Sequence, residues 1–284
     1  MKYVLGSSFL ILFLAFSTPV AEAASLNTIE RQVLLKQIEV LQAEVIRLQQ
    51  LLGGGGAYRT QVVDDVYPSR FYDGPYEALY FVEGDDLYRR HGNGVRYGDG
   101  LLWDTFVNLV GSSFIRDNLA EFRIFNDDEN LLTGYVEQRT DGEWILAINR
   151  FGDSLVEDHD SEFMIELLIH ESTHIVFFND LVYETDFIAE FWDTGLMRSH
   201  SRDLERADDF IERNEIGDDF YNDYPQLFVS DYAASDPIED VVESFVYFVL
   251  NDRPRGNSVR DQKVRFFYDY PTLLQWRDEI RDQL

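Results

Sequence analysis

The chain has 284 residues, with 53 acidic and 24 basic side chains, so its formal net charge at pH 7 is −29. This acidity excludes a general nucleic-acid-binding protein, because binding phosphates requires a basic surface. It is compatible with a protein kept soluble by self-repulsion in an extracellular or salty environment, and with a preference for basic substrates. There is no cysteine, so a large core must stabilise the fold without disulfides.

Residues 1–24 have the pattern of a secretory signal peptide. Lys2 supplies a positive start, residues 5–16 are apolar, and Ala21-Glu22-Ala23 offers a small-x-small cleavage site. The alternative is an uncleaved membrane anchor, although the apolar stretch is short for a span. We therefore expect an exported protein that is secreted, periplasmic or at the cell surface, and that is held at a membrane only if the leader is uncleaved.

Residues 25–52 are expected to form a short coiled-coil helix. Within 28–52, apolar residues alternate at spacings of four and three: Leu34, Ile38, Leu41, Val45, Leu48 and Leu52. This heptad pattern favours a parallel homodimer, and the alternative is an amphipathic helix docked on its own domain or on the envelope. Residues 53–57 begin with four glycines and are predicted to be a flexible linker to a domain that spans 58–284.

The first part of that domain, up to about residue 152, is rich in strand and turn signals. A hairpin is expected from residues 134–138 and 143–149, which flank the turn Arg139-Thr140-Asp141-Gly142. The second arm is almost filled with apolar residues, as a core strand is.

The most informative segment is His170-Glu171-Ser172-Thr173-His174, within a helix expected over residues 161–178. Residues four apart lie on one helix face, so His170 and His174 can share a metal ion. Glu171 is offset from His170 by about 100° and can reach a metal-bound water without ligating the metal. That is the general-base position of the H-E-x-x-H motif of zinc peptidases. The alternative is a chance pattern of two histidines without a chemical role.

The same helix should pack into the core through one apolar stripe. The residues assigned to this stripe are Phe163, Met164, Leu167, Leu168, Ile175 and Phe178. Asp160 or Ser161 can cap its first turn. His159 and His200 lie outside the motif and are expected in loops.

A catalytic Zn²⁺ generally takes three protein ligands and leaves one position for water, so a carboxylate ligand is expected downstream. A helix predicted to start at Asp236-Pro237 carries Glu239 and Glu243 one turn apart, and one of them can bind zinc while the other orients a ligating histidine. Alternatively, Glu239 belongs to a capping box at this helix start. A rival pair, Asp186 and Glu190, is also one turn apart and lies nearer to His174 in sequence.

With these two segments, His170–His174 and Tyr232 followed seven residues later by Glu239, the chain resembles the gluzincin metallopeptidases, most closely the lethal-factor-type branch. The resemblance implies an α+β zincin-like domain built of a small sheet, an active-site helix and a glutamate helix. It further implies that Glu239 is the third ligand, that Glu243 lies outside the ligand set, and that Tyr232 stabilises an oxyanion. An edge strand, a role open to the arm 143–149, would line the substrate cleft.

We therefore expect a secreted or envelope-associated zinc peptidase, most simply an endopeptidase, that hydrolyses peptide or protein substrates through a zinc-activated water. The alternative is a noncatalytic envelope or assembly protein that uses the coiled coil and has a structural or degenerate metal site. The C-terminal residues 259–284 are expected to form two helices broken at Pro271.

Overall fold

The computed structural model describes residues 69–72, 74–90, 94–127, 132–150 and 158–284. The expected signal peptide, coiled-coil helix and linker lie outside these residues. None of the helices in the described ranges is long and apolar enough to cross a membrane.

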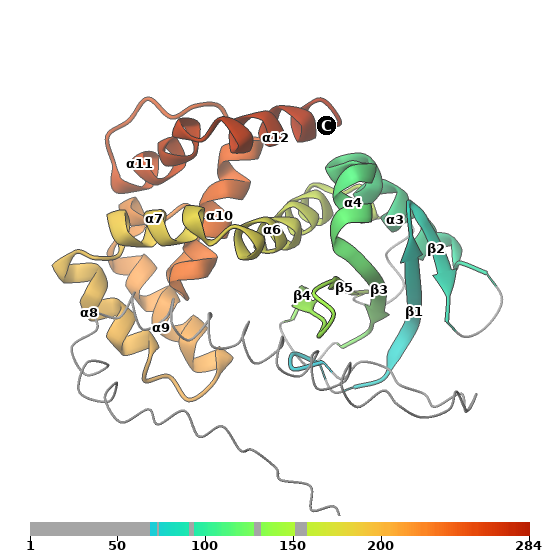
Figure 1. The fold of residues 1–284 in the computed structure, drawn as a ribbon. Helices are drawn as coiled ribbons and strands as arrows, with labels where there is room; N and C mark the ends of the chain where they lie inside the picture. Colours follow the sequence, from blue (N-terminus) through green and yellow to red (C-terminus); the bar gives the residue numbers. More distant parts are fainter. Residues whose placement is uncertain (1–68, 73, 91–93, 128–131, 151–157) are drawn as a thin grey trace, which may run out of the picture.

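A five-stranded mixed sheet forms one side of the molecule (Figure 1). Its strand order is β2-β1-β3-β5-β4, with β3 and β5 parallel and the other neighbours antiparallel. The strands are β1 (Tyr76–Glu83), β2 (Asp86–Arg89), β3 (Leu119–Phe125), β4 (Gly134–Gln138) and β5 (Trp144–Asn149). β4 and β5 form the expected hairpin.

The second arm of this hairpin is not an edge strand, so the expectation that it could line the substrate cleft as an edge strand is wrong. β5 lies between β3 and β4, and all of its residues are buried. A run of apolar residues without polar alternation suits a strand covered on both faces. The first arm, β4, is instead the edge of the sheet, and it contacts the helix that carries the two histidines.

The helices make the fold α+β, as expected. The described residues contain nine α-helices: α3 (Tyr97–Val110), α4 (Ser112–Asn118), α6 (Glu162–Asn179), α7 (Leu181–Phe191), α8 (Gly195–Leu204), α9 (Phe210–Asp223), α10 (Pro237–Leu250), α11 (Val259–Phe266) and α12 (Pro271–Arg281). The break at Pro271 is confirmed, because α12 starts there after a short 3₁₀ turn, η3 (Phe267–Asp269).

Helix α6 lies between the sheet and helices α7 and α10 (Figure 1). It contacts β4 and α3 on one side and α7 and α10 on the other. Its start is fixed by Ser161, whose side chain accepts a hydrogen bond from the Met164 amide. The expected apolar stripe is largely buried, but Phe163 is 53% exposed and was wrongly assigned to the core. Phe163 lies about 100° away from Met164 around the helix and faces a cleft instead.

Helix α10 is held in the core by its apolar face. Val241, Val242 and Phe245 are fully buried, and the Phe245 ring packs against those of Phe177 on α6 and Phe267 on η3, at centroid distances of 5.4 and 5.3 Å. Burying each such side chain contributes about 1.5–3 kcal/mol. This packing fixes the rotation of α10, so that its glutamates face α6.

Candidate metal centre

Three ligand atoms from α6 and α10 converge on one point. His170 Nε2 lies 3.1 Å from His174 Nε2, and Glu239 Oε2 lies 3.3 and 3.4 Å from these two nitrogens. In a tetrahedral zinc site with bonds of about 2.0–2.1 Å, neighbouring ligand atoms are about 3.3–3.4 Å apart. His170, His174 and Glu239 therefore form a group that can hold a metal ion.

The surroundings of the Glu239 carboxylate also suit a metal ligand. Its Oε2 is buried and makes no regular hydrogen bond within the described residues, so a metal ion would give this oxygen the partner that it lacks. Burial alone would raise the pKa of Glu239, but the facing imidazoles of His174 and His170 hold it well below its usual range. The carboxylate is thus ionised, as a ligand must be.

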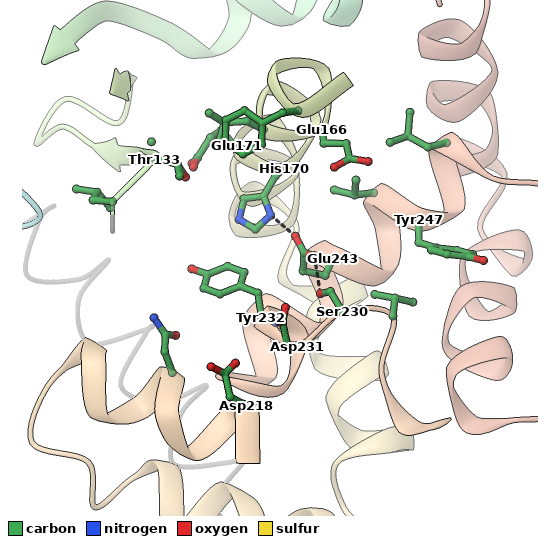
Figure 2. Close-up of a pocket in the computed structure, with 18 of the residues that line it drawn as sticks. Thr133, Glu166, His170, Glu171, Asp218, Ser230, Asp231, Tyr232, Glu243 and Tyr247 are labelled. Carbon is green, nitrogen blue, oxygen red and sulfur yellow. Dashed lines mark hydrogen bonds and ion pairs between the residues drawn. The ribbon is translucent and has the colours of Figure 1, made fainter. Parts of the chain in front are cut away.

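Glu243 orients His170 from behind. Its Oε1 lies 2.8 Å from His170 Nδ1, and its Oε2 accepts a hydrogen bond of 2.7 Å from the Ser230 hydroxyl (Figure 2). A proton on Nδ1, shared with the carboxylate, leaves the Nε2 lone pair free for a metal. The sequence alone does not identify Ser230 as a site residue, because no helical spacing connects it to the motif. The only sequence feature that points to it is its position shortly before Tyr232.

Glu171 lies against the edge strand β4. Its side chain is buried, and the Val136 amide donates a hydrogen bond to its carboxylate. A Cβ atom on Gly134 would lie 3.3 Å from Glu171 Oε1, so a glycine there lets the strand approach the carboxylate. Burial raises the pKa of Glu171, against the opposing effect of the two histidines. A raised pKa brings a carboxylate closer to the range of a general base.

Tyr232 comes from the short turn η2 (Tyr232–Ala234), just before α10. Its ring centroid lies 5.9 Å from that of His170, and it lies on a different side of His170 from Glu171 (Figure 2). Burial raises its pKa well above the ordinary value, and the nearby carboxylates of Glu239, Glu171 and Glu243 raise it further. The Tyr232 hydroxyl therefore keeps its proton at neutral pH and can donate it in a hydrogen bond.

The turn that carries Tyr232 is held by two residues that sequence reasoning did not assign to the site. His200, expected in a loop, is instead buried on α8, where Nε2 donates to the Ala234 carbonyl at 2.6 Å and the ring stacks on Phe220. Gly217 of α9 packs against the backbone of Ser235: a Cβ atom there would meet it at 2.8 Å. The inserted helices α8 and α9 thus position Tyr232.

The Gly217→Ala substitution should displace this turn and thereby weaken any activity that uses Tyr232. A misplacement near 1 Å can lower a rate by about 100-fold, so any reaction that uses Tyr232 should have a 10- to 100-fold lower kcat, with the metal content unchanged. Gly195→Ala, at a helical position with open space around the added carbon, is the matched control and should retain turnover. Equal turnover in both variants would contradict the positioning role of α9.

The rival carboxylates do not reach the metal-ligand group. Asp186 and Glu190 lie on α7, and Asp186 Oδ2 accepts a hydrogen bond of 3.0 Å from the Tyr270 hydroxyl. Neither residue belongs to the group formed by the two histidines and Glu239. Asp236 caps α10 as expected, with its side chain accepting from the Ile238 amide, while Glu239 faces the histidines rather than forming a capping box.

A cleft of about 550 Å³ lies beside this group. It is lined by the start of β4, the first half of α6, α9, η2 and the second half of α10, and it contains His170, Glu171 and Tyr232. No protein-family model, curated protein or solved structure matches this chain.

Proposed function

We propose that this protein is a zinc-dependent peptidase of the gluzincin type. The observation that carries the proposal is the convergence of three ligand atoms in the arrangement of a tetrahedral site, with a carboxylate and a tyrosine beside them in one cleft. Two imidazoles and one carboxylate are the ligand set of many catalytic zinc sites. Zinc bound by His170, His174 and Glu239 would act as a Lewis acid and lower the pKa of a coordinated water.

The remaining groups suit hydrolysis of a peptide bond. Glu171 accepts the proton of the attacking water and then delivers it to the leaving amine. Tyr232 donates its hydroxyl proton in a hydrogen bond to the oxyanion that develops on the scissile carbonyl. His170 is held in the correct tautomer by Glu243, which is itself fixed by Ser230.

The edge strand supports a peptide as the substrate. β4 pairs on one side with β5, and its other side is the edge of the sheet beside Glu171. A sheet edge that pairs with no further strand can offer backbone amides and carbonyls to an extended chain, which binds as an added strand. Gly134, the first residue of this strand, and Thr133 just before it line the cleft, and Figure 2 shows Thr133 at this position. An extended substrate would therefore pass over the metal-ligand group along β4.

Metal analysis of three proteins tests the proposal. We expect one zinc per chain in the wild type and in Asp186→Ala, and loss of zinc in Glu239→Ala, because that variant leaves only two protein ligands. The measurement is mass spectrometry of metal in the purified full chain, alongside cleavage of a peptide library. Zinc retained in Glu239→Ala and lost in Asp186→Ala would transfer the third ligand to α7. A wild type that binds no zinc when it is offered would overturn the proposal.

A further inference from the structure

One side of the cleft forms a recess between α6 and α10. We call it the α6–α10 recess, and it is lined by Glu166, Leu167, Val246, Tyr247 and Leu250. Glu166 lies one helical turn before His170, so that both side chains lie on the same face of α6. Glu166 and Tyr247 lie on the side of His170 away from Thr133 (Figure 2). The recess is thus next to the metal-ligand group but separate from the edge strand.

Glu166 is a carboxylate without a partner in this recess. Its side chain is exposed at the recess. Among the described residues it makes no hydrogen bond or ion pair. By contrast, Glu171 accepts a hydrogen bond from Val136, and Glu243 bonds to His170 and Ser230. The described residues that line the cleft include no Lys or Arg. Partial burial and the charges of Glu162 and Glu243 raise the pKa of Glu166.

The other walls of the recess are apolar. Leu167 comes from α6, and Val246, Tyr247 and Leu250 come from the last two turns of α10. Apolar walls with one carboxylate are complementary to a long side chain that has an aliphatic stem and a cationic end, as Arg and Lys have. A purely apolar side chain would fill the walls but leave the Glu166 charge partly desolvated and unpaired.

We infer that the α6–α10 recess selects peptide substrates that carry an arginine or lysine at one fixed position relative to the cleaved bond, with Glu166 binding the cationic end. This inference rests on the proposed peptidase function and specifies its substrate class. Glu166 would act as a specificity-determining residue, because it contacts the substrate side chain and neither the metal nor the reacting atoms. The same recess would discriminate against substrates with an acidic residue at that position.

Matched peptide pairs test this inference. A peptide library is first digested with the zinc-loaded full chain to locate cleavage sites, and a cleaved sequence is then made with arginine or with citrulline, which has the same shape without the charge. We expect kcat/KM to be 10- to 100-fold higher for the arginine peptide, which corresponds to about 1.4–2.8 kcal/mol. The Glu166→Gln variant should bring this ratio close to one while it still cleaves the citrulline peptide.

Two further variants make the test specific. Glu162→Gln removes an exposed carboxylate one turn earlier on α6 that does not line the cleft, and it should keep the arginine preference. Glu166→Lys should lower cleavage of the arginine peptide and favour a glutamate peptide. Unchanged zinc content and thermal unfolding would show that both Glu166 variants are folded.

The outcomes separate this inference from the proposed function. Cleavage without an arginine or lysine preference, or a preference that survives Glu166→Gln, would overturn the inference and leave the peptidase proposal standing. A zinc-loaded wild type that cleaves no member of the library would overturn both. A preference lost only in the Glu166 variants would support the role of the recess.

Discussion

Replacing Glu171 by glutamine should abolish peptide cleavage without loss of the metal. Glutamine has the shape of glutamate, and its side-chain oxygen can still accept the hydrogen bond from the Val136 amide on β4. It cannot accept a proton from an attacking water at neutral pH. Because general-base catalysis contributes about 10²- to 10⁴-fold, we expect kcat to fall by about 1000-fold or more, which corresponds to about 4 kcal/mol in the barrier.

Kinetics and metal analysis of the same preparations measure both parts of this expectation. The variant should retain one zinc per chain, since Glu171 is not among the ligand atoms that converge on the metal position. Glu190→Gln, an exposed carboxylate on α7, is the control and should leave kcat unchanged. Wild-type turnover in Glu171→Gln would remove Glu171 from the mechanism, and loss of zinc would mean that its carboxylate binds the metal.

Local spacing was enough to predict the elements that carry the site. The interval of four between His170 and His174 places both on one face of a helix, and the observed α6 differs from the expected range by only one residue at each end. The same rule applied to Glu239 and Glu243 puts both on one face of α10. Their different environments, with Glu239 facing two imidazole nitrogens and Glu243 behind His170, are tertiary facts that spacing alone left open.

Residues that hold the site from other elements could not be predicted in this way. Ser230, His200 and Gly217 act through contacts with residues 13, 34 and 18 positions away in the chain, and no periodic pattern connects such pairs. Which strand forms the edge of the sheet could not be predicted either, because β5 is an interior strand only through its parallel pairing with β3. A pairing between strands that are separated by another strand is a property of the fold rather than of either segment.

Helix α10 depends on a second feature that the sequence did not reveal, a buried ion pair behind Glu239. Lys263 of α11 is fully buried, with Nζ 2.5 Å from Asp240 Oδ2, and the Trp192 indole donates to the same oxygen at 2.7 Å. Nζ also lies 4.1 Å from the centroid of the Phe228 ring. Burial lowers the pKa of Lys263 and raises that of Asp240, so each charged form relies on the other.

Replacing Lys263 by methionine should strongly destabilise the fold, because it leaves the Asp240 carboxylate buried without a counter-charge. Breaking such a pair costs about 3–5 kcal/mol. In a domain of this size, that loss corresponds to a decrease of about 6–20 °C in Tm. Urea and thermal unfolding at pH 7 measure it, and Arg206→Met, which removes the cation of an exposed pair with Asp203, should change stability by less than about 1 kcal/mol.

The pH dependence and a double variant identify the cause of that loss. In Lys263→Met the folded-state pKa of Asp240 stays above its unfolded value of about 3.9, so the penalty is complete above the folded-state pKa. It should shrink, relative to the wild type, as the pH falls toward the unfolded value and Asp240 becomes protonated in the fold. Adding Asp240→Asn should likewise recover part of the stability, because no charge is then left buried. A deficit that is the same at every pH and in the double variant would assign the loss to packing of the lysine stem, and α10 would then be anchored by apolar contacts alone.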